Sequence, residues 1–272
     1  MGLVKKKPLT KIKEDPKLII VTSLKGGVGK STVSSAMASV IAHTYNHKIC
    51  GIDGDETGSL TKNLGGDLSL PGTAHLLCKS LGDEAQLQEF DDYLAVYSGN
   101  EYLLDRKFRP SFSAFSNHVK ELMNAGISVL IDTSNKEHNL LFNFLDLATD
   151  ILVVFNPDAD AFAKGEEIMD HIEASYTNGV GPKTHLVLTD YRAGKTQHMS
   201  VLYSKKIPAR WPDTPFFILK HSPAFPKCRE FKCPITKWDH KKGEPRLDAD
   251  FIAKGPYITD IQSIVSFIYN EG

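Results

Sequence analysis

The chain has 272 residues, of which 41% are hydrophobic and 24% charged, and its formal net charge is −1. These values lie within the ranges of ordinary globular proteins, and the length allows a large buried core. No apolar run approaches the roughly 18 residues of a transmembrane helix, and no basic and apolar leader opens the sequence. We therefore expect a soluble, cytoplasmic protein.

Strand-like apolar runs alternate with helical patterns along the chain, after a basic N-terminal arm at residues 1–16. We predict strands at 17–23, 48–53, 93–98, 127–133, 150–156, 184–190 and 215–220. We predict helices at about 30–45, 111–125, 138–148, 160–177, 195–206 and 257–269. Alternation of this kind predicts an α/β fold with a doubly wound, mostly parallel sheet and helices on both faces. We assign residues 17–272 to one domain.

The connection between the first predicted strand and the first predicted helix is rich in glycine. It reads Lys25, Gly26, Gly27, Val28, Gly29, Lys30, Ser31, Thr32. Such a turn presents backbone N–H groups to phosphate oxygens, and the dipole of the following helix adds positive potential. Lys30 would reach the β- and γ-phosphates of a nucleoside triphosphate, and the Ser31 hydroxyl would hold Mg²⁺. The alternative is a plain glycine-rich turn with two solvated lysines.

The turn departs from the standard phosphate loop at two positions. Leu24 stands where the standard loop has its first glycine, and a second lysine, Lys25, opens the turn. The run K-G-G-V-G-K-S-T resembles the deviant phosphate loop of the ParA/MinD family, in particular of ParA-type partition ATPases. The resemblance implies a P-loop ATPase that binds ATP and Mg²⁺ through residues 25–32 and forms an ATP-dependent homodimer. Lys25 would then contact the phosphates in the partner subunit.

Two carboxylates follow the second predicted strand, in the run from Ile52 to Leu60. Asp53-Gly54-Asp55 resembles the start of the family's D-x-D-P-Q-G element, with Glu56-Thr57 in place of Pro-Gln. Carboxyl ends of parallel strands carry the ligand-facing groups of an open α/β sheet, so this pair should lie beside the phosphate loop. We expect Asp55 to orient the attacking water near Mg²⁺ and Asp53 to support the turn.

A third element lies at the end of the predicted strand 127–133, where four small or apolar residues precede Asp132. This pattern has the form of a Walker B motif, in which Asp132 holds Mg²⁺ directly or through water. The run 135–138 superficially matches a guanine-reading motif, but its fourth residue is His138 and it follows Asp132 too closely, which favours ATP over GTP. The resemblance extends over residues 17–235 and implies a base contact for Thr189.

The four cysteines do not make a disulfide framework, and we expect reduced thiols. Two of them lie between histidines, in the set His221, Cys228, Cys233, His240. Four such side chains would suit zinc, but the cysteine spacing is wide and no close histidine pair accompanies it. A loop with two ordinary cysteines is the alternative that we favour.

Charge is distributed unevenly along the chain. Lys and Arg number six against two acidic residues at 1–17, seven against eighteen at 53–160, and eleven against four at 205–246. Together with the resemblance, two basic segments indicate non-specific binding to the DNA phosphate backbone rather than solubility alone. The candidate contacts are Arg192, Lys195, Arg210, Lys220, Lys227, Arg229 and Lys232.

The resemblance leaves several functions open. A ParA-like ATPase would be released from DNA by a ParB-like stimulating partner and would be associated with the nucleoid. A MinD-like ATPase needs a basic amphipathic C-terminal helix for the membrane, whereas residues 258–268 carry an apolar stripe without Lys or Arg, so we expect no stable membrane association. An iron–sulfur relative would need a different cysteine arrangement, and a metabolic ligase with the same loop is a further alternative.

Overall fold

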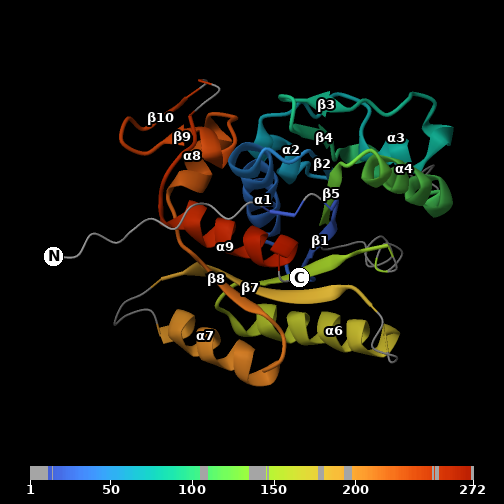
Figure 1. The fold of residues 1–272 in the computed structure, drawn as a ribbon. Coiled ribbons are helices and arrows are strands. Elements are labelled where there is room, and N and C mark those ends of the chain that lie inside the picture. Colours follow the sequence, from blue (N-terminus) through green and yellow to red (C-terminus); the bar gives the residue numbers. More distant parts are fainter. Residues whose placement is uncertain are drawn as a thin grey trace.

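The predicted strands come together in one sheet in the computed structural model, which describes residues 12–13, 15–104, 110–134, 145, 147–176, 181–192, 198–246, 248 and 251–270. In spatial order (Figure 1) the eight strands are β3 (Gln88–Glu89), β4 (Leu94–Tyr97), β2 (Ile49–Gly54), β5 (Ser128–Thr133), β1 (Leu18–Thr22), β6 (Asp150–Phe155), β7 (Lys183–Tyr191) and β8 (Phe216–Lys220). Neighbouring strands are parallel except β3, which is antiparallel to β4. Every residue of β1, β2, β5 and β6 is buried, as in a sheet covered on both faces.

Helices cover both faces of the sheet (Figure 1). One apolar cluster joins the sheet to α1 (Lys30–Tyr45), α2 (Ser59–Leu64), α8 (Ala224–Glu230) and α9 (Pro256–Asn270). A second cluster joins the opposite face to α3 (Thr73–Leu77), α4 (Phe112–Asn124), α6 (Ala159–Ser175) and α7 (His198–Arg210). The predicted fold class, a doubly wound and mostly parallel α/β sheet, is confirmed.

Helix α9 shows how the apolar pattern fixes the packing. Ile258, Ile261, Ile264, Val265 and Ile268 recur at helical spacing and are buried against α1 and β8. The expectation that this segment is a core-packing helix is confirmed. Within the described residues, moreover, the helices are too short or too polar for any of them to span a bilayer.

All seven predicted strands are present, and four of the six predicted helices match closely. The helix expected at 195–206 is described from His198 and extends past its expected end to Arg210, with Pro208 inside it. The helix expected at 138–148 and the arm at 1–16 lie almost wholly outside the described residues. The short elements were not predicted, because an element of only a few residues is too short to show a period of hydrophobic positions. They are α2, α3, α8, β3, the hairpin β9 (Trp238–Asp239) and β10 (Glu244–Pro245), and the 3₁₀ turns η1 (Lys79–Leu81), η2 (Glu101–Leu104) and η3 (Ile235–Lys237).

Candidate functional site

The phosphate loop lies where the strand order reverses. β1 stands between β5 and β6, and the chain leaves its carboxyl end, turns through the loop and enters α1. Gly27 and Gly29 have positive φ values of 76° and 98°, which glycine adopts without strain. Ligands bind open α/β sheets at such a crossing point, and a helix N-terminus there attracts anions.

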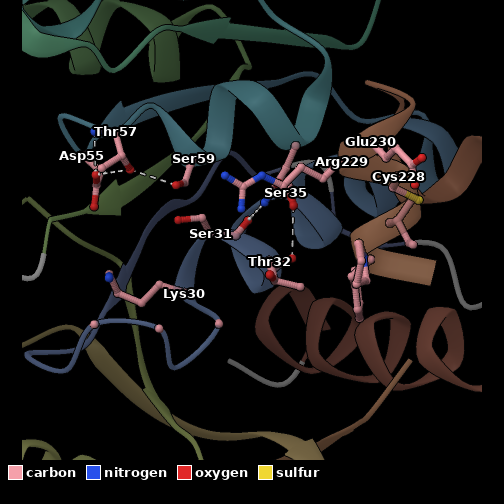
Figure 2. Close-up of a pocket in the computed structure, with 17 residues that line it drawn as sticks. Lys30, Ser31, Thr32, Ser35, Asp55, Thr57, Ser59, Cys228, Arg229 and Glu230 are labelled. Atoms are coloured by element: carbon pink, nitrogen blue, oxygen red, sulfur yellow. Dashed lines mark hydrogen bonds between the residues drawn. The ribbon is translucent and has the colours of Figure 1, made fainter. Parts of the chain in front are cut away.

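A cavity of about 850 Å³ opens in front of this loop (Figure 2). Besides the loop and α1, its wall comes from the turn after β2, from helices α2 and α8, and from Ile235 at the start of η3. Its lining residues are Gly26, Gly27, Gly29, Lys30, Ser31, Thr32, Ser35, Asp55, Thr57, Ser59, Asn63, Phe225, Pro226, Cys228, Arg229, Glu230 and Ile235. The structure therefore brings most of the predicted phosphate-loop residues together with Asp55 around one cavity large enough for a nucleotide.

Two buried carboxylates lie beneath the cavity. Asp53 and Asp132 are paired in register on the neighbouring parallel strands β2 and β5, and both are 0% exposed. Burial and, after it, the adjacent Asp132 carboxylate raise the pKa of Asp53 to about 7. Burial also raises the pKa of Asp132, to about 6, against the opposing effects of the Lys30 ammonium and the Ser31 and Ser34 hydroxyls. A cation bound beside Asp53 and Asp132 would therefore stabilise the ionised forms of both carboxylates.

One carboxylate oxygen of Asp132 has the surroundings expected of a Mg²⁺ ligand. Oδ1 accepts a hydrogen bond of 2.9 Å from the Ser34 hydroxyl, whereas the buried Oδ2 has no hydrogen-bond partner among the described residues. An unpaired buried carboxylate oxygen beside the Ser31 hydroxyl offers the hard oxygen ligands that Mg²⁺ prefers, and nucleotide phosphates and waters supply the others. The residues present thus fit the metal.

Asp53 and Asp55 have different surroundings. Asp53 Oδ2 accepts two bonds of 2.8 Å from the backbone N–H and the hydroxyl of Thr61, and its Oδ1 accepts the N–H of Asp55 at 3.2 Å. Asp53 thus supports the turn, as expected. Asp55 faces the cavity, and its Oδ1 accepts the N–H and the hydroxyl of Thr57 at 2.8 and 2.5 Å (Figure 2). Its role with water stays a prediction.

Lys25 turns away from the cavity of its own chain. Its Nζ lies 2.5 Å from Oδ2 of Asp160 and 3.9 Å from Oδ1 of Asp158, both at the N-terminus of α6. The Asp160 hydrogen bond is the main reason that the pKa of Lys25 is raised above its ordinary value. Lys30, in contrast, is 6% exposed and lines the cavity. The two lysines of the loop therefore face different surroundings.

Thr189 lies under the phosphate loop. Its Oγ1 is 2.5 Å from the carbonyl oxygen of Val28 and 3.0 Å from that of Phe155, so one hydroxyl is shared between the loop and the end of β6. A Cβ added at Gly29 would lie 3.3 Å from the same oxygen. The geometry shows Thr189 supporting the loop, and the expected contact to the base stays a prediction.

Sequence reasoning missed the part of the wall that α8 contributes. Phe225, Pro226, Arg229 and Glu230 line the cavity (Figure 2). They lie about 200 positions after the loop in a helix of seven residues, which is too short for a periodic signal. Of these residues, only Arg229 was a candidate in the sequence analysis, where its basic segment predicted a contact to DNA rather than to this cavity.

The candidate zinc ligands do not converge. His221 Nδ1 lies 2.5 Å from Asp190 Oδ1, and His240 Nε2 bonds to the Tyr257 hydroxyl. Within the described ranges, no three His, Cys, Asp or Glu side chains are placed to hold a metal ion by themselves. The alternative that we favoured, a loop with two ordinary cysteines, was wrong in one respect, because Cys228 lies in helix α8.

The basic segment 205–246 does not form one surface. Helix α7 carries Lys205, Lys206 and Arg210 and packs on one face of the sheet, whereas α8 and the residues after it pack on the other. Four of the candidate DNA contacts are within ion-pair distance of a carboxylate, namely Arg192 with Asp190, Arg210 with Glu166 and Asp170, Lys220 with Asp260, and Lys227 with Glu230. Lys195 lies outside the described residues.

Arg229 and Lys232 do share a surface. With Lys62, Gly65, Gly66, Asp67 and Leu68 they line a second cavity of about 600 Å³, and Arg229 lines both cavities. The basic groove beside the nucleotide cavity therefore has three cations and one carboxylate.

Fold and site together define a nucleotide-binding protein with a phosphate loop. The family model of the CobQ/CobB/MinD/ParA nucleotide binding domain matches residues 19–235, and the chain belongs to this family. It is an ATP-binding ATPase of the ParA/MinD type. No curated protein matches the sequence.

Solved structures of the same fold include different branches of the family. An ATP complex of McdA from Cyanothece has a TM-score of 0.72 at 13% identity, over 93% of this chain and 96% of that one. A ParA family ATPase from Chlorobium tepidum has a TM-score of 0.69 at 13% identity, over 96% and 100%. The cell division ATPase MinD from Pyrococcus furiosus has a TM-score of 0.68 at 17% identity, over 94% and 99%. At these identities the likeness concerns the fold alone.

Proposed function

We propose that the chain is a ParA-like ATPase that forms a homodimer around ATP and Mg²⁺. The observation that carries the proposal is the orientation of Lys25, which turns out of its own cavity toward the exposed carboxylates of α6. A lysine that only served its own nucleotide would have reason to face the cavity, as Lys30 does. In the dimer Lys25 exchanges Asp160 for the partner's nucleotide phosphates, which carry more negative charge.

The proposed reaction is transfer of the γ-phosphoryl group to water. Ser31 and Asp132 would hold Mg²⁺, which neutralises charge on the phosphates when bound, and Asp55 would contact the metal through water. Lys30 and the loop N–H groups hold the phosphates, and Asp55 orients the attacking water and accepts its proton. Thr57 fixes the Asp55 carboxylate by its two hydrogen bonds.

The nucleobase would lie on the α8 side of the cavity. Phe225 and Pro226 provide apolar surface there, while the loop and Asp55 occupy the polar side. An aromatic ring and a proline suit the flat face of adenine. The adenine of ATP would therefore stack on this side of the cavity.

In its ATP state the dimer would bind DNA without reading sequence. The basic groove of Lys62, Arg229 and Lys232 adjoins the nucleotide cavity, and a dimer presents two copies of it. A ParB-like partner would stimulate hydrolysis and so release the protein from the nucleoid in the cytoplasm. The MinD-like alternative lacks support from α9, whose apolar stripe is buried in the core.

A DNA-retention assay tests this function with ATP, with ADP and without nucleotide, each with Mg²⁺. Retention is expected only with ATP, and it should fall by about 10³ to 10⁵ in affinity between 50 and 200 mM salt if about six to ten phosphates are contacted. The Lys30→Ala variant controls for nucleotide binding. Equal retention in all three states would contradict the proposal, and sedimentation with anionic vesicles but not with DNA would favour the MinD-like alternative.

A further inference from the structure

The end of helix α8 brings two cysteines together. After Glu230 the chain turns through Lys232, whose φ of 48° is left-handed. The N–H of Lys232 bonds to the carbonyl of Arg229 at 3.4 Å, and the N–H of Cys233 bonds to that of Cys228 at 3.0 Å. These two bonds make a Schellman motif, in which the first residue beyond the left-handed position packs its side chain against the last turn of the helix. Cys228 and Cys233 occupy those two positions.

This motif limits how far apart the two residues lie. With a 3.0 Å bond from Cys233 N to Cys228 O, standard backbone dimensions keep the two Cα atoms within about 7 Å of each other. A disulfide needs Cα atoms about 4.4–6.8 Å apart. The backbone therefore already holds the pair at the separation of a disulfide while both cysteines are free thiols.

Each thiol changes the other's chemistry. The hydrogen bond between them lowers the pKa of Cys233 and raises that of Cys228. Cys233 is thus the member that reaches the reactive thiolate form more readily. Both side chains are 4% exposed, and Cys228 lines the nucleotide cavity, which connects the pair to solvent.

We propose that Cys228 and Cys233 are a thiol modification site that peroxide oxidises to an intramolecular disulfide beside the nucleotide cavity. The Cys233 sulfur attacks one peroxide oxygen, giving a sulfenic acid and releasing water as the O–O bond breaks. The Cys228 sulfur then attacks the sulfenic sulfur, its proton leaves with the hydroxyl as a second water, and the S–S bond forms. Two thiols lose two electrons and two protons in total, and one peroxide is reduced to two waters.

Nucleotide should protect this site. The disulfide would close a loop of six residues, 228–233, and this loop includes Arg229 and Glu230, which line the same cavity. A nucleotide in the cavity covers the Cys228 side of the pair, so that only the nucleotide-free fraction reacts. This part of the inference rests on the proposed nucleotide site, whereas formation of the disulfide does not.

Peptide mapping of the peroxide-treated wild-type protein tests the proposal. Trypsin cleaves after Arg229 and Lys232, so Cys228 and Cys233 fall on separate peptides that only a disulfide joins. We expect the joined peptides, two hydrogens lighter than the reduced pair together, while Cys50 and Cys78 remain available for alkylation after denaturation. With ADP and Mg²⁺ at about ten times Kd, oxidation should slow about tenfold.

Three variants define the outcomes. Cys233→Ser and Cys228→Ala should each abolish the joined peptide, and the mapping on wild type stands even if one of them folds poorly. Lys30→Ala should form the disulfide at the same rate with and without ADP. Separate peptides carrying sulfinic or sulfonic acid, or untouched thiols at peroxide levels that oxidise free cysteine, would overturn the site. A disulfide that forms equally fast with saturating ADP in wild type would overturn only its link to the cavity.

Discussion

The Nζ of Lys25 lies 2.5 Å from Oδ2 of Asp160, so that the first lysine of the phosphate loop is held by the N-terminus of α6 in the single chain. A second carboxylate, Asp158, lies 3.9 Å from the same nitrogen and also caps α6 through a 2.8 Å bond from the Ala161 N–H. In the proposed dimer the lysine would leave both carboxylates to reach the partner subunit. The ion pair would then oppose dimerisation.

Asp160→Asn should strengthen the ATP-dependent dimer. Asp160 is 61% exposed, so the pair is solvated and its loss should lower the dimer Kd by only about 1.5- to 5-fold at low salt, less as salt rises. Sedimentation equilibrium with ATP and Mg²⁺ measures this Kd. Glu167→Gln is the matched control, because it breaks another exposed pair on the same helix, Lys164 with Glu167 at 2.8 Å. A weaker dimer in Asp160→Asn would show that Asp160 serves the interface itself.

Alanine substitutions at the two lysines of the loop should impair different steps of the ATPase cycle. Lys30→Ala should abolish ATP binding, because the buried ammonium faces the cavity. Lys25→Ala should leave the ATP Kd within about threefold of wild type, while ATP-dependent dimerisation and turnover fall by about 100-fold or more, as when a stabilising cation is withdrawn from phosphoryl transfer. Nucleotide titration calorimetry, light scattering and phosphate release separate these effects. Normal turnover in Lys25→Ala would place that lysine outside the mechanism, and Lys164→Ala controls for loss of an exposed charge.

The sequence alone predicted those parts of the site that follow directly after a buried strand. The loop and the carboxylates Asp53, Asp55 and Asp132 follow buried strands, and a parallel sheet brings strand ends to one edge, so their meeting was predictable. The pairing of Lys25 with Asp160 was not, because it depends on how α6 packs. Nor was the position of Arg229, because it depends on α8 packing against α2.

Thr189→Val tests the support beneath the loop. Valine keeps the shape of threonine but removes the hydroxyl shared by the carbonyls of Val28 and Phe155, and the residue is 6% exposed. Leaving a buried carbonyl without its donor costs about 1–3 kcal/mol. We expect that loss of unfolding free energy in denaturant melts, together with weaker ATP binding. Thr189→Ser, which restores the hydroxyl, should recover most of both, and a loss of ATP affinity without any loss of stability would instead indicate a direct contact to the base.

The carboxylate pair beneath the cavity should make the nucleotide-free protein less stable as pH rises. The pKa of Asp53 is raised by burial to about 7 in the folded state, above its unfolded value, so the folded state binds more protons than the unfolded state between about pH 4 and pH 7. Unfolding free energy therefore falls through that window, by on the order of 1–4 kcal/mol, because the unfolded state loses the proton that Asp53 keeps beside Asp132 in the fold. Asp53→Asn removes this titration and one of the two acceptor oxygens that serve Thr61 and Asp55, so wild type should lose stability relative to the variant as pH rises from 5 to 8. Denaturant melts at each pH, without nucleotide or Mg²⁺, measure the difference. Asp67→Asn is the matched control, because hydrogen bonds from Ser69 lower the pKa of Asp67 and this carboxyl is ionised in both states from pH 5 to 8, so its difference from wild type should stay constant there. A difference between wild type and Asp53→Asn that stays constant with pH would mean that Asp53 keeps its ordinary pKa in the fold.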